Sequence, residues 1–254
     1  MTANIPASFK ALLFAFPLFV AIPLMAAEFH DGLDALKPEK WAEGSTHGNW
    51  YVQFTGALDG DGFVAIQQEA GTNVLVEKPA TALSSTTHSS LVTSLTTFGD
   101  FEMTLEMKTL QQLKQSPNNW EVAWAVWHYT SNQSFYYFVL KPEGWEIGRR
   151  DLAYVQKAEE GKRPNDGQDI LFTENGSFPI QTWYTVRIRQ VGNTISVWVN
   201  GQKLGDFKDP AKIEDNIPDH KWPAKRALPY LDGAIGLYTE DALVQFRNIH
   251  AKSL

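Results

Sequence analysis

The sequence predicts an all-β protein, an antiparallel β-sandwich with long loops, and three observations lead to that prediction. Nearly every periodic segment alternates apolar and polar residues with a period of two, as residues 101–108 do. The dipeptides Gly192-Asn193 and Asn200-Gly201 are typical of two-residue turns between antiparallel strands. No segment carries an apolar stripe with the length and spacing of a helix.

The N-terminal segment is typical of a secretory signal peptide. Lys10 is followed by residues 11–24, which are all apolar apart from two prolines, and then by two alanines, Ala26 and Ala27. We therefore predict that residues 1–27 are removed and that residues 28–254 form a single sandwich domain. A membrane anchor is the alternative, but the apolar run is shorter than the ~20 residues that cross a bilayer. The protein is expected to be secreted or periplasmic, with no membrane contact after cleavage.

Charge and cysteine content exclude several classes of function. The chain has 254 residues with 22 Lys and Arg against 29 Asp and Glu, a net charge of −7. Residues 1–27 contain one Lys and no acid, so the remainder has 21 basic and 29 acidic residues and a net charge of −8. Such an acidic surface argues against nucleic acid and anionic membranes as partners. The absence of cysteine excludes disulfides, a thiol nucleophile and a cysteine-based zinc site.

The first clear strand is predicted over residues 101–108. Its alternate residues separate into an apolar face and a polar face, so one face should be core and the other solvated. The apolar face consists of Phe101, Met103, Leu105 and Met107, and the polar face of Glu102, Thr104, Glu106 and Lys108.

Residues 120–151 are unusually aromatic, and we interpret them as three antiparallel strands. The first turn, residues 130–134, has an ambiguous length, and a shift of one residue exchanges the two faces of a strand. In one register Tyr129 pairs with Tyr136, so His128 faces Tyr137 and Trp124 faces Lys141. A second turn at Glu143-Gly144 then puts Lys141 opposite Glu146 and Tyr137 opposite Arg150.

In that register the three strands have one apolar face and one mixed aromatic and charged face. The apolar face, a good core, comprises Ala123, Ala125, Trp127, Tyr136, Phe138 and Leu140. The mixed face presents Trp124, His128, Tyr137, Lys141, Glu146 and Arg150. In the alternative register Val122, Trp124 and Val126 are core, Trp127 and Tyr129 face solvent, and His128 is a satisfied rim residue.

Two long irregular stretches follow, residues 157–177 and 208–229, and loops of this length in a compact domain are often functional. Between them, pairing Val191 with Thr194 across Gly192-Asn193 sets two further pairs of apolar residues on one buried face. These pairs are Ile188 with Val197 and Val186 with Val199. Pairing Val199 with Gln202 brings Leu204 opposite Val197. On the reverse face Arg187 lies beside Trp198, either as an exposed cation–π pair or as a ligand contact.

The mixed face suits a sugar, because the C–H faces of a pyranose stack on aromatic rings while charged groups bind its hydroxyls. We therefore predict that Trp124, Tyr137, Lys141 and Arg150 bind an oligo- or polysaccharide in a concave groove.

Glu146 and His128 are the candidate catalytic residues. A glycoside hydrolase usually needs two carboxyl groups, and a partner for Glu146 would come from another strand or loop, with Asp151, Asp166 and Asp169 the nearest. A lyase would instead use a base such as His128 or Tyr137 with a cation, Arg150 or Lys141. A single Glu on a sheet face is more often solvated surface.

Signals for a metal or cofactor are weak. Asp31 and Asp34 could supply oxygens to a structural calcium ion, but surface turn acids explain them equally simply. The six histidines show no zinc-binding spacing, and no phosphate-binding glycine loop is present.

The chain resembles the concanavalin A-like lectin/glucanase superfamily, especially its laminin-G-like and 3-keto-disaccharide hydrolase (DUF1080) branches. The residues that carry the resemblance are 98–102, 120–128, 135–138, 183–188, 198–201, 233–238 and 244–249. The resemblance implies a jelly roll of two curved antiparallel sheets with the glycan site on the concave sheet, and it places His128 in that groove. Calcium is common in the superfamily.

The resemblance does not supply a mechanism. The E-x-D-x-x-E strand of laminarinase-like glycosidases is absent, as are the R-[ST]-E-L and Q-[IV]-H motifs of alginate lyase relatives. The leading hypothesis is a secreted glycoside hydrolase or lyase. The alternatives are a non-catalytic lectin or adhesion module and a structural domain that binds protein partners.

Overall fold

A computed structural model describes residues 28–31, 33–57, 60–81, 86–150, 168–209 and 230–254. All regular secondary structure in these ranges is β-strand. No helix in the described part of the chain is long and apolar enough to span a membrane. The predicted signal peptide, residues 1–27, lies outside the described residues.

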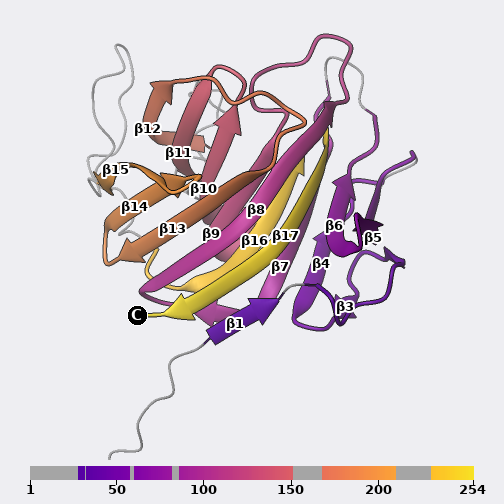
Figure 1. The fold of residues 1–254 in the computed structure, drawn as a ribbon, viewed down its shortest axis with the longest axis horizontal. Helices are drawn as coiled ribbons and strands as arrows, with labels where there is room; N and C mark the ends of the chain where they lie inside the picture. Colours follow the sequence, from indigo (N-terminus) through magenta and orange to yellow (C-terminus); the bar gives the residue numbers. More distant parts are fainter. Residues whose placement is uncertain (1–27, 32, 58–59, 82–85, 151–167, 210–229) are drawn as a thin grey trace, which may run out of the picture.

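The strands form two antiparallel sheets that stack face to face (Figure 1). The nine-stranded sheet has the order β15 (Gln202–Lys208), β14 (Thr194–Val199), β13 (Tyr184–Val191), β8 (Phe101–Gln112), β17 (Ala242–Ser253), β6 (Thr72–Lys78), β5 (Phe63–Glu69) and β2 (Lys40–Trp41), and β1 (Glu28–Asp31) pairs with β17. The eight-stranded sheet has the order β12 (Gln168–Asn175), β11 (Gly144–Arg150), β10 (Ser134–Lys141), β9 (Ala123–Ser131), β16 (Gly233–Glu240), β7 (Ser89–Phe98), β4 (Trp50–Phe54) and β3 (Thr46–His47). The predicted all-β antiparallel sandwich is therefore confirmed.

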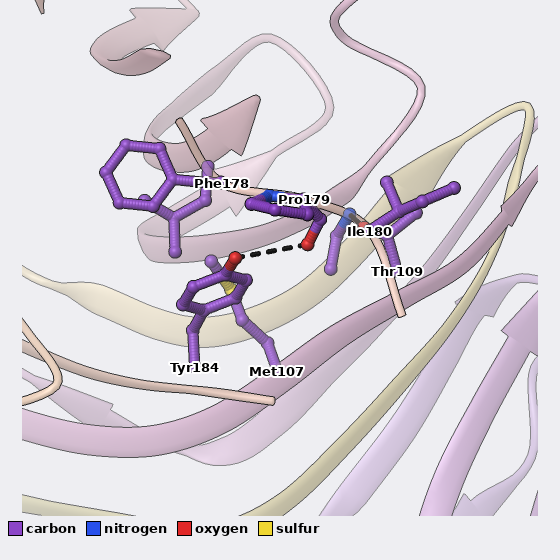
Figure 2. Close-up of a pocket in the computed structure, with 8 residues that line it drawn as sticks. Met107, Thr109, Phe178, Pro179, Ile180 and Tyr184 are labelled. Carbon is purple, nitrogen blue, oxygen red and sulfur yellow. Dashed lines mark hydrogen bonds between the residues drawn. The ribbon is translucent and has the colours of Figure 1, made fainter. Parts of the chain in front are cut away.

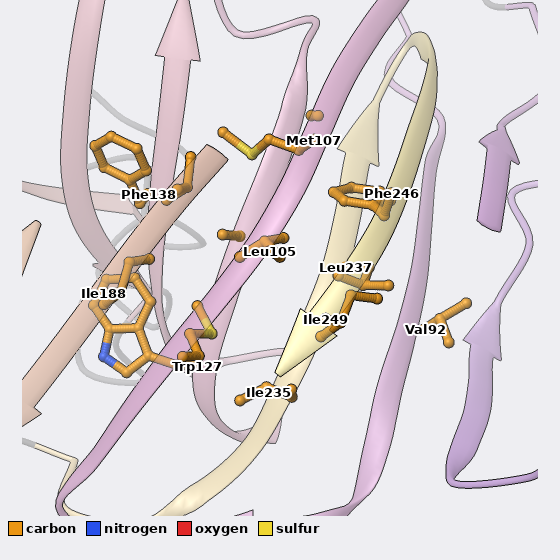
Figure 3. Close-up of a cluster of buried hydrophobic side chains, with 14 of the residues drawn as sticks. Val92, Leu105, Met107, Trp127, Phe138, Ile188, Ile235, Leu237, Phe246 and Ile249 are labelled. Atoms are coloured by element: carbon orange, nitrogen blue, oxygen red, sulfur yellow. The ribbon is translucent and has the colours of Figure 1, made fainter. Parts of the chain in front are cut away.

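The main core lies between the two sheets. Leu105, Met107 and Ile188 of the nine-stranded sheet point toward Trp127 and Phe138 of the eight-stranded sheet (Figure 3). The alternation predicted for residues 101–108 is confirmed, because the four apolar side chains are buried in this core and Glu102, Thr104 and Glu106 are only partly buried. Lys108, the last of the predicted polar face, is buried and bonds Glu69.

The hairpin of β13 and β14 has the predicted register. Val191 pairs with Thr194, and the two apolar pairs predicted next to it are present. The guanidinium carbon of Arg187 lies 3.7 Å from the centre of the Trp198 ring, which confirms the cation–π pair. Leu204 opposite Val197 is wrong, because a bulge between Val197 and Trp198 pairs Val197 with Gly205.

Residues 120–151 contain the three predicted strands, β9, β10 and β11, but both hairpins differ from the predicted register. Between the pairs Ser131–Ser134 and Trp127–Tyr136, residues 128–130 of β9 lie opposite Phe135 alone. Tyr136 therefore pairs with Trp127 and not with Tyr129.

The second hairpin turns at Pro142-Glu143, so Lys141 pairs with Gly144 and not with Glu146. Tyr137 lies opposite Gly148 and not Arg150, and Glu146 lies opposite Val139. In each hairpin the observed register differs from the predicted one by two residues, and a shift of two residues leaves each side chain on its predicted face. The predicted division into a core face and a mixed face therefore survives everywhere except at the bulge.

One predicted irregular stretch contains a strand. Gln168–Asn175 forms β12, at the edge of the eight-stranded sheet. Only one of its side chains, Asp169, is fully buried, so the apolar alternation that marks a half-buried strand is weak in its sequence. Residues 157–167 and 210–229 lie outside the described part of the chain.

Candidate functional site

A second apolar cluster lies on the outer face of the eight-stranded sheet, away from the main core. A row of directly paired residues passes through this cluster and crosses six strands, from β4 to β11. The row runs Phe54, Leu91, Tyr238, Trp124, Val139 and Glu146. The Trp124 ring packs 4.7 Å from Tyr137 and 5.2 Å from Tyr238, centre to centre. Trp124 and Tyr137, both predicted to bind sugar, are on this face but fully buried.

The Glu146 carboxylate ends this row and accepts three hydrogen bonds. Its Oε1 accepts from the Tyr137 hydroxyl at 2.7 Å. Its Oε2 accepts from Lys141 Nζ at 2.8 Å and from Trp120 Nε1 at 3.1 Å. Glu146 is 1% exposed, so the three donors replace the water that a carboxylate would otherwise bind. The structure thus brings together three of the predicted site residues, Glu146, Lys141 and Tyr137, with Trp124 packed against them.

Trp120 is the part of this group that solvent reaches. It is 38% exposed, and Lys141 Nζ lies 4.8 Å from the centre of its ring. Its carbonyl oxygen accepts the indole N–H of Trp124 at 2.9 Å. Sequence reasoning did not select Trp120 as a site residue. The available signal was its position at the start of the aromatic stretch, three residues before β9 begins.

A second carboxylate with a tyrosine donor lies on β16. The Tyr238 hydroxyl donates to Glu240 Oε1 at 2.6 Å. Burial, and then the neighbouring carboxylates, raise the pKa of Tyr137 and of Tyr238 well above the usual value, so both phenols stay protonated. Burial also raises the pKa of Glu240, and Tyr238 and Arg150 oppose that rise. Glu240 was not predicted, because nothing in the sequence links the C-terminal hairpin to β11.

Arg150 lies at the end of β11, where it pairs with Phe135. It is half-buried, and its charge partly opposes the rise in the pKa of both Glu240 and Tyr238. Arg150 thus acts electrostatically on the β16 carboxylate.

His128 does not join the predicted face. At the bulge its backbone has a left-handed φ of 49°, and its ring packs 5.3 Å from Phe101 of the opposite sheet. Nδ1 lies 2.7 Å from the carbonyl oxygen of Tyr230 and Nε2 lies 2.9 Å from that of Gly99. Burial lowers its pKa, which the two carbonyl oxygens partly offset. His128 therefore faces the space between the sheets and not Tyr137, because the bulge turns it away from the alternation of β9.

Of the three acids suggested as partners for Glu146, the described one, Asp169, lies away from the outer face. Asp169 is buried on the core side, with its Oδ2 3.7 Å from Arg149 Nε. Arg149 also bonds Asp209, which accepts from the Tyr136 hydroxyl at 2.6 Å. Asp151 and Asp166 lie outside the described residues. Glu240 is a described acid that shares the outer face with Glu146.

Within the described residues no three His, Cys, Asp or Glu side chains gather closely enough to hold a metal ion. Asp34 is exposed, and the side chain of Asp31 is not among those described.

A small cavity lies near one end of the main core, where Tyr184 and Met107 face Pro179 (Figure 2). Its volume is about 10 Å³, and the Tyr184 hydroxyl closes it by donating to the Pro179 carbonyl at 3.1 Å. A cavity of that size holds about one water molecule, so it cannot take a sugar.

Comparison with known protein families identifies the domain. Residues 37–252 match the model of the 3-keto-alpha-glucoside-1,2-lyase-like domain. The chain belongs to this family. The match confirms the resemblance to the 3-keto-disaccharide hydrolase (DUF1080) branch and supports a carbohydrate-related function. No curated protein matches the chain.

Several solved structures are similar to this 3-keto-alpha-glucoside-1,2-lyase-like domain. The carbohydrate-binding module CBM66 from Bacillus subtilis has 10% identity and a TM-score of 0.48, over 79% of this chain and 93% of that one. A prokaryotic β-1,3-1,4-glucanase (lichenase) derived from a mouse hindgut metagenome has 12% identity and a TM-score of 0.49, over 89% and 98%. An alginate lyase of polysaccharide lyase family 7 has 11% identity and a TM-score of 0.41, over 74% and 82%.

Proposed function

We propose that the protein is an exported carbohydrate-active enzyme that cleaves a glycoside carrying a ketone at C3. The sugar lies in a groove on the outer face of the eight-stranded sheet, beside Trp120. The observation that carries the proposal is the Glu146 carboxylate, which three donors surround next to a half-exposed tryptophan. The name of the family model suggests the reaction class and the substrate.

The reaction we propose is an elimination across C1 and C2 of the keto sugar. The C3 ketone makes the proton on C2 acidic. A base removes that proton, the C1–C2 double bond forms, and the bond from C1 to the glycosidic oxygen breaks. The leaving oxygen takes up a proton, so the products are an unsaturated keto sugar and an alcohol. The site must therefore supply a base, a cation for the enolate oxygen at C3, and a proton donor.

The outer face offers a candidate base and a candidate cation, and the base, once protonated, supplies the proton that the leaving oxygen takes up. Glu146 is the candidate base, and Lys141 Nζ, 2.8 Å from it, is the cation for the enolate oxygen. Trp120 supports the sugar ring by stacking. Because Glu146 is 1% exposed, the Trp120 ring or the Lys141 side chain must swing aside when substrate binds.

The test is to incubate the purified protein with a 3-keto-α-glucoside and with the same glucoside unoxidised. We expect an unsaturated keto sugar and free alcohol from the keto sugar only. Glu146→Gln should lower kcat by at least about 100-fold, the usual contribution of a general base. Glu143→Gln is the matched control, because Glu143 is an exposed glutamate in the adjacent turn.

Glu146→Gln also breaks a buried ion pair, so its folding must be checked by circular dichroism. Trp120→Ala provides an independent measurement, because Trp120 is partly exposed and should mainly raise KM. Full activity of a folded Glu146→Gln protein, or no product from either sugar, would reject the enzyme proposal.

One observation favours a second candidate, a non-catalytic sugar-binding module. Both oxygens of Glu146 accept hydrogen bonds from side chains of the protein. A carboxylate with the structural role of positioning Trp120 and Lys141 would have the same contacts. A binding module would retain glycans without forming product, and Trp120→Ala would release them.

The export proposal rests on residues 1–27. Mass spectrometry of the protein recovered from the extracellular medium or periplasm should give a mature chain that starts at Glu28.

A further inference from the structure

A pocket of about 250 Å³ opens where β4 meets β7, at the other end of the outer face from Glu146. We infer that this pocket binds one neutral pyranose ring and is a second sugar subsite. The inference deepens the proposed function, since it rests on a saccharide being the ligand of this face.

The pocket is separate from the Glu146 group. Phe54, which lines it, begins the row of paired residues that ends at Glu146. Five strand spacings of ~4.8 Å separate the two residues, which is about 24 Å along the sheet. That distance exceeds the length of one sugar ring several times. A ligand that reached both places would be an oligosaccharide lying across the strands.

The pocket wall combines an aromatic ring with hydrogen-bond acceptors. Phe54 lines the pocket with an aromatic ring, which packs in a T-shaped arrangement with Tyr238, 6.4 Å between centres. Glu43 is exposed, and its Oε2 accepts the backbone N–H of Thr55 at 3.3 Å. Thr87 adds an exposed hydroxyl.

His88 contributes a further acceptor of fixed orientation. Its Nδ1 lies 2.9 Å from the carbonyl oxygen of Ala80, so the neutral ring carries its proton on Nδ1 and leaves Nε2 as an acceptor. Asp241 holds the backbone of His88 through two hydrogen bonds. Its Oδ1 accepts the His88 N–H at 2.8 Å, and its own N–H donates to the His88 carbonyl at 2.9 Å. Asp241 is itself paired with Lys114 at 2.7 Å. A wall fixed in this way loses little entropy when a ligand binds.

This set of groups selects the chemical class of the ligand. A carboxylate, an imidazole acceptor and a hydroxyl suit a ligand with several O–H donors, and the Phe54 ring suits the C–H face of a sugar. None of the described residues that line the pocket is Lys or Arg, so a uronate or phosphate would meet the Glu43 charge without a cation. A neutral pyranose fits these requirements, and an acidic sugar does not.

The test is an NMR titration of ¹⁵N-labelled protein. The Glu146→Gln variant is titrated, and the Trp120→Ala variant takes its place if Glu146→Gln does not fold. The probes are methyl α-D-glucopyranoside and methyl α-D-glucuronopyranoside. We expect saturable shifts of the Thr87 and Ser89 amides and of the His88 ring with the neutral glycoside, and binding of the glucuronide at least about tenfold weaker.

Thr87→Trp should fill the pocket and abolish these shifts, whereas Thr194→Trp, an exposed threonine on β14, should leave them unchanged. Glu43→Gln, which is exposed and should fold, is expected to weaken binding about tenfold. The inference is overturned if the neutral glycoside gives no saturable shifts, if Thr87→Trp preserves them, or if the glucuronide binds as tightly. If the shifts appear but the native protein forms no product, the proposed reaction is rejected and the subsite is retained. If product forms but the shifts do not appear, the subsite is rejected and the proposed reaction is retained.

Discussion

Tyr137 packs directly over Gly148 of the neighbouring strand. A Cβ atom on Gly148 would lie 2.1 Å from the Tyr137 hydroxyl oxygen, the group that donates to Glu146. Gly148→Ala should therefore displace the Tyr137 ring and lower the free energy of unfolding by about 1–3 kcal/mol, the usual cost of overpacking. Urea denaturation measures this change. Gly99→Ala is the control, because a Cβ there meets only Leu231 O at an ordinary 3.6 Å, and equal stability losses for both variants would contradict the prediction.

For individual residues, the sequence predicted which side chains share the outer face more accurately than it predicted which of them contact one another. Trp124, Tyr137, Lys141 and Glu146 were placed together because alternation alone decides the face of a strand residue. Their contacts depend on register and on side-chain length. Lys141 reaches Glu146 although Gly144 is its paired residue. Trp120 and Glu240 were missed because no local pattern connects them to β11.

Among the strands, the hairpin of β13 and β14 offers a direct test of cross-strand pairing. Arg187 stacks on Trp198 with 3.7 Å between the guanidinium carbon and the ring centre. A double-mutant cycle with Arg187→Ala and Trp198→Ala should give a coupling free energy of about 0.5–1 kcal/mol, typical of a cation–π pair near the surface, because both residues are partly exposed. The same cycle with Arg189→Ala should give a coupling near zero, since Arg189 pairs with Ser196. Coupling of similar size in both cycles would exclude a specific stacking contribution.

Bulges account for much of what could not be predicted about the strands. Gly192-Asn193 fixed one register because a two-residue turn leaves a single pairing. The turn after β9 gave no such signal, and the extra residues of β9 moved His128 from the outer face to the space between the sheets. A bulge depends on how the backbone packs against both neighbouring strands, and the alternation of a single strand does not reveal it.

For the whole molecule, Glu77 should control part of the pH dependence of stability. It lies between the sheets with 0% exposure, and a contact with the Ser90 side chain opposes the effect of burial on its carboxyl group only in part. Burial raises its pKa well above 4.5, so the folded protein binds its proton more tightly than the unfolded chain does. The stability of the protonated form is fully present below about pH 4.5 and falls as the pH rises toward the folded-state pKa.

Glu77→Gln should remove this loss of stability, because glutamine has no carboxyl group to deprotonate. The free energy of unfolding of the variant should therefore increasingly exceed that of the native protein as the pH rises. Thermal unfolding of both proteins from about pH 5 to pH 9 measures this difference. His128, whose lowered pKa makes stability fall below about pH 6.5, contributes equally to both proteins. Glu174→Gln, at an exposed position on β12, is the control. Parallel pH profiles for Glu77→Gln and the native protein would contradict the prediction.

The pairing of β1 with β17 has a consequence for engineering. Glu28 lies opposite Lys252, so the beginning and the end of the described sandwich are neighbours in one antiparallel pair. A short linker could join them into a circular permutant with new termini in a loop at the far end of the molecule. Two reporter groups attached at Glu28 and at Lys252 would lie side by side, and energy transfer between them would report the loss of this strand pair during unfolding.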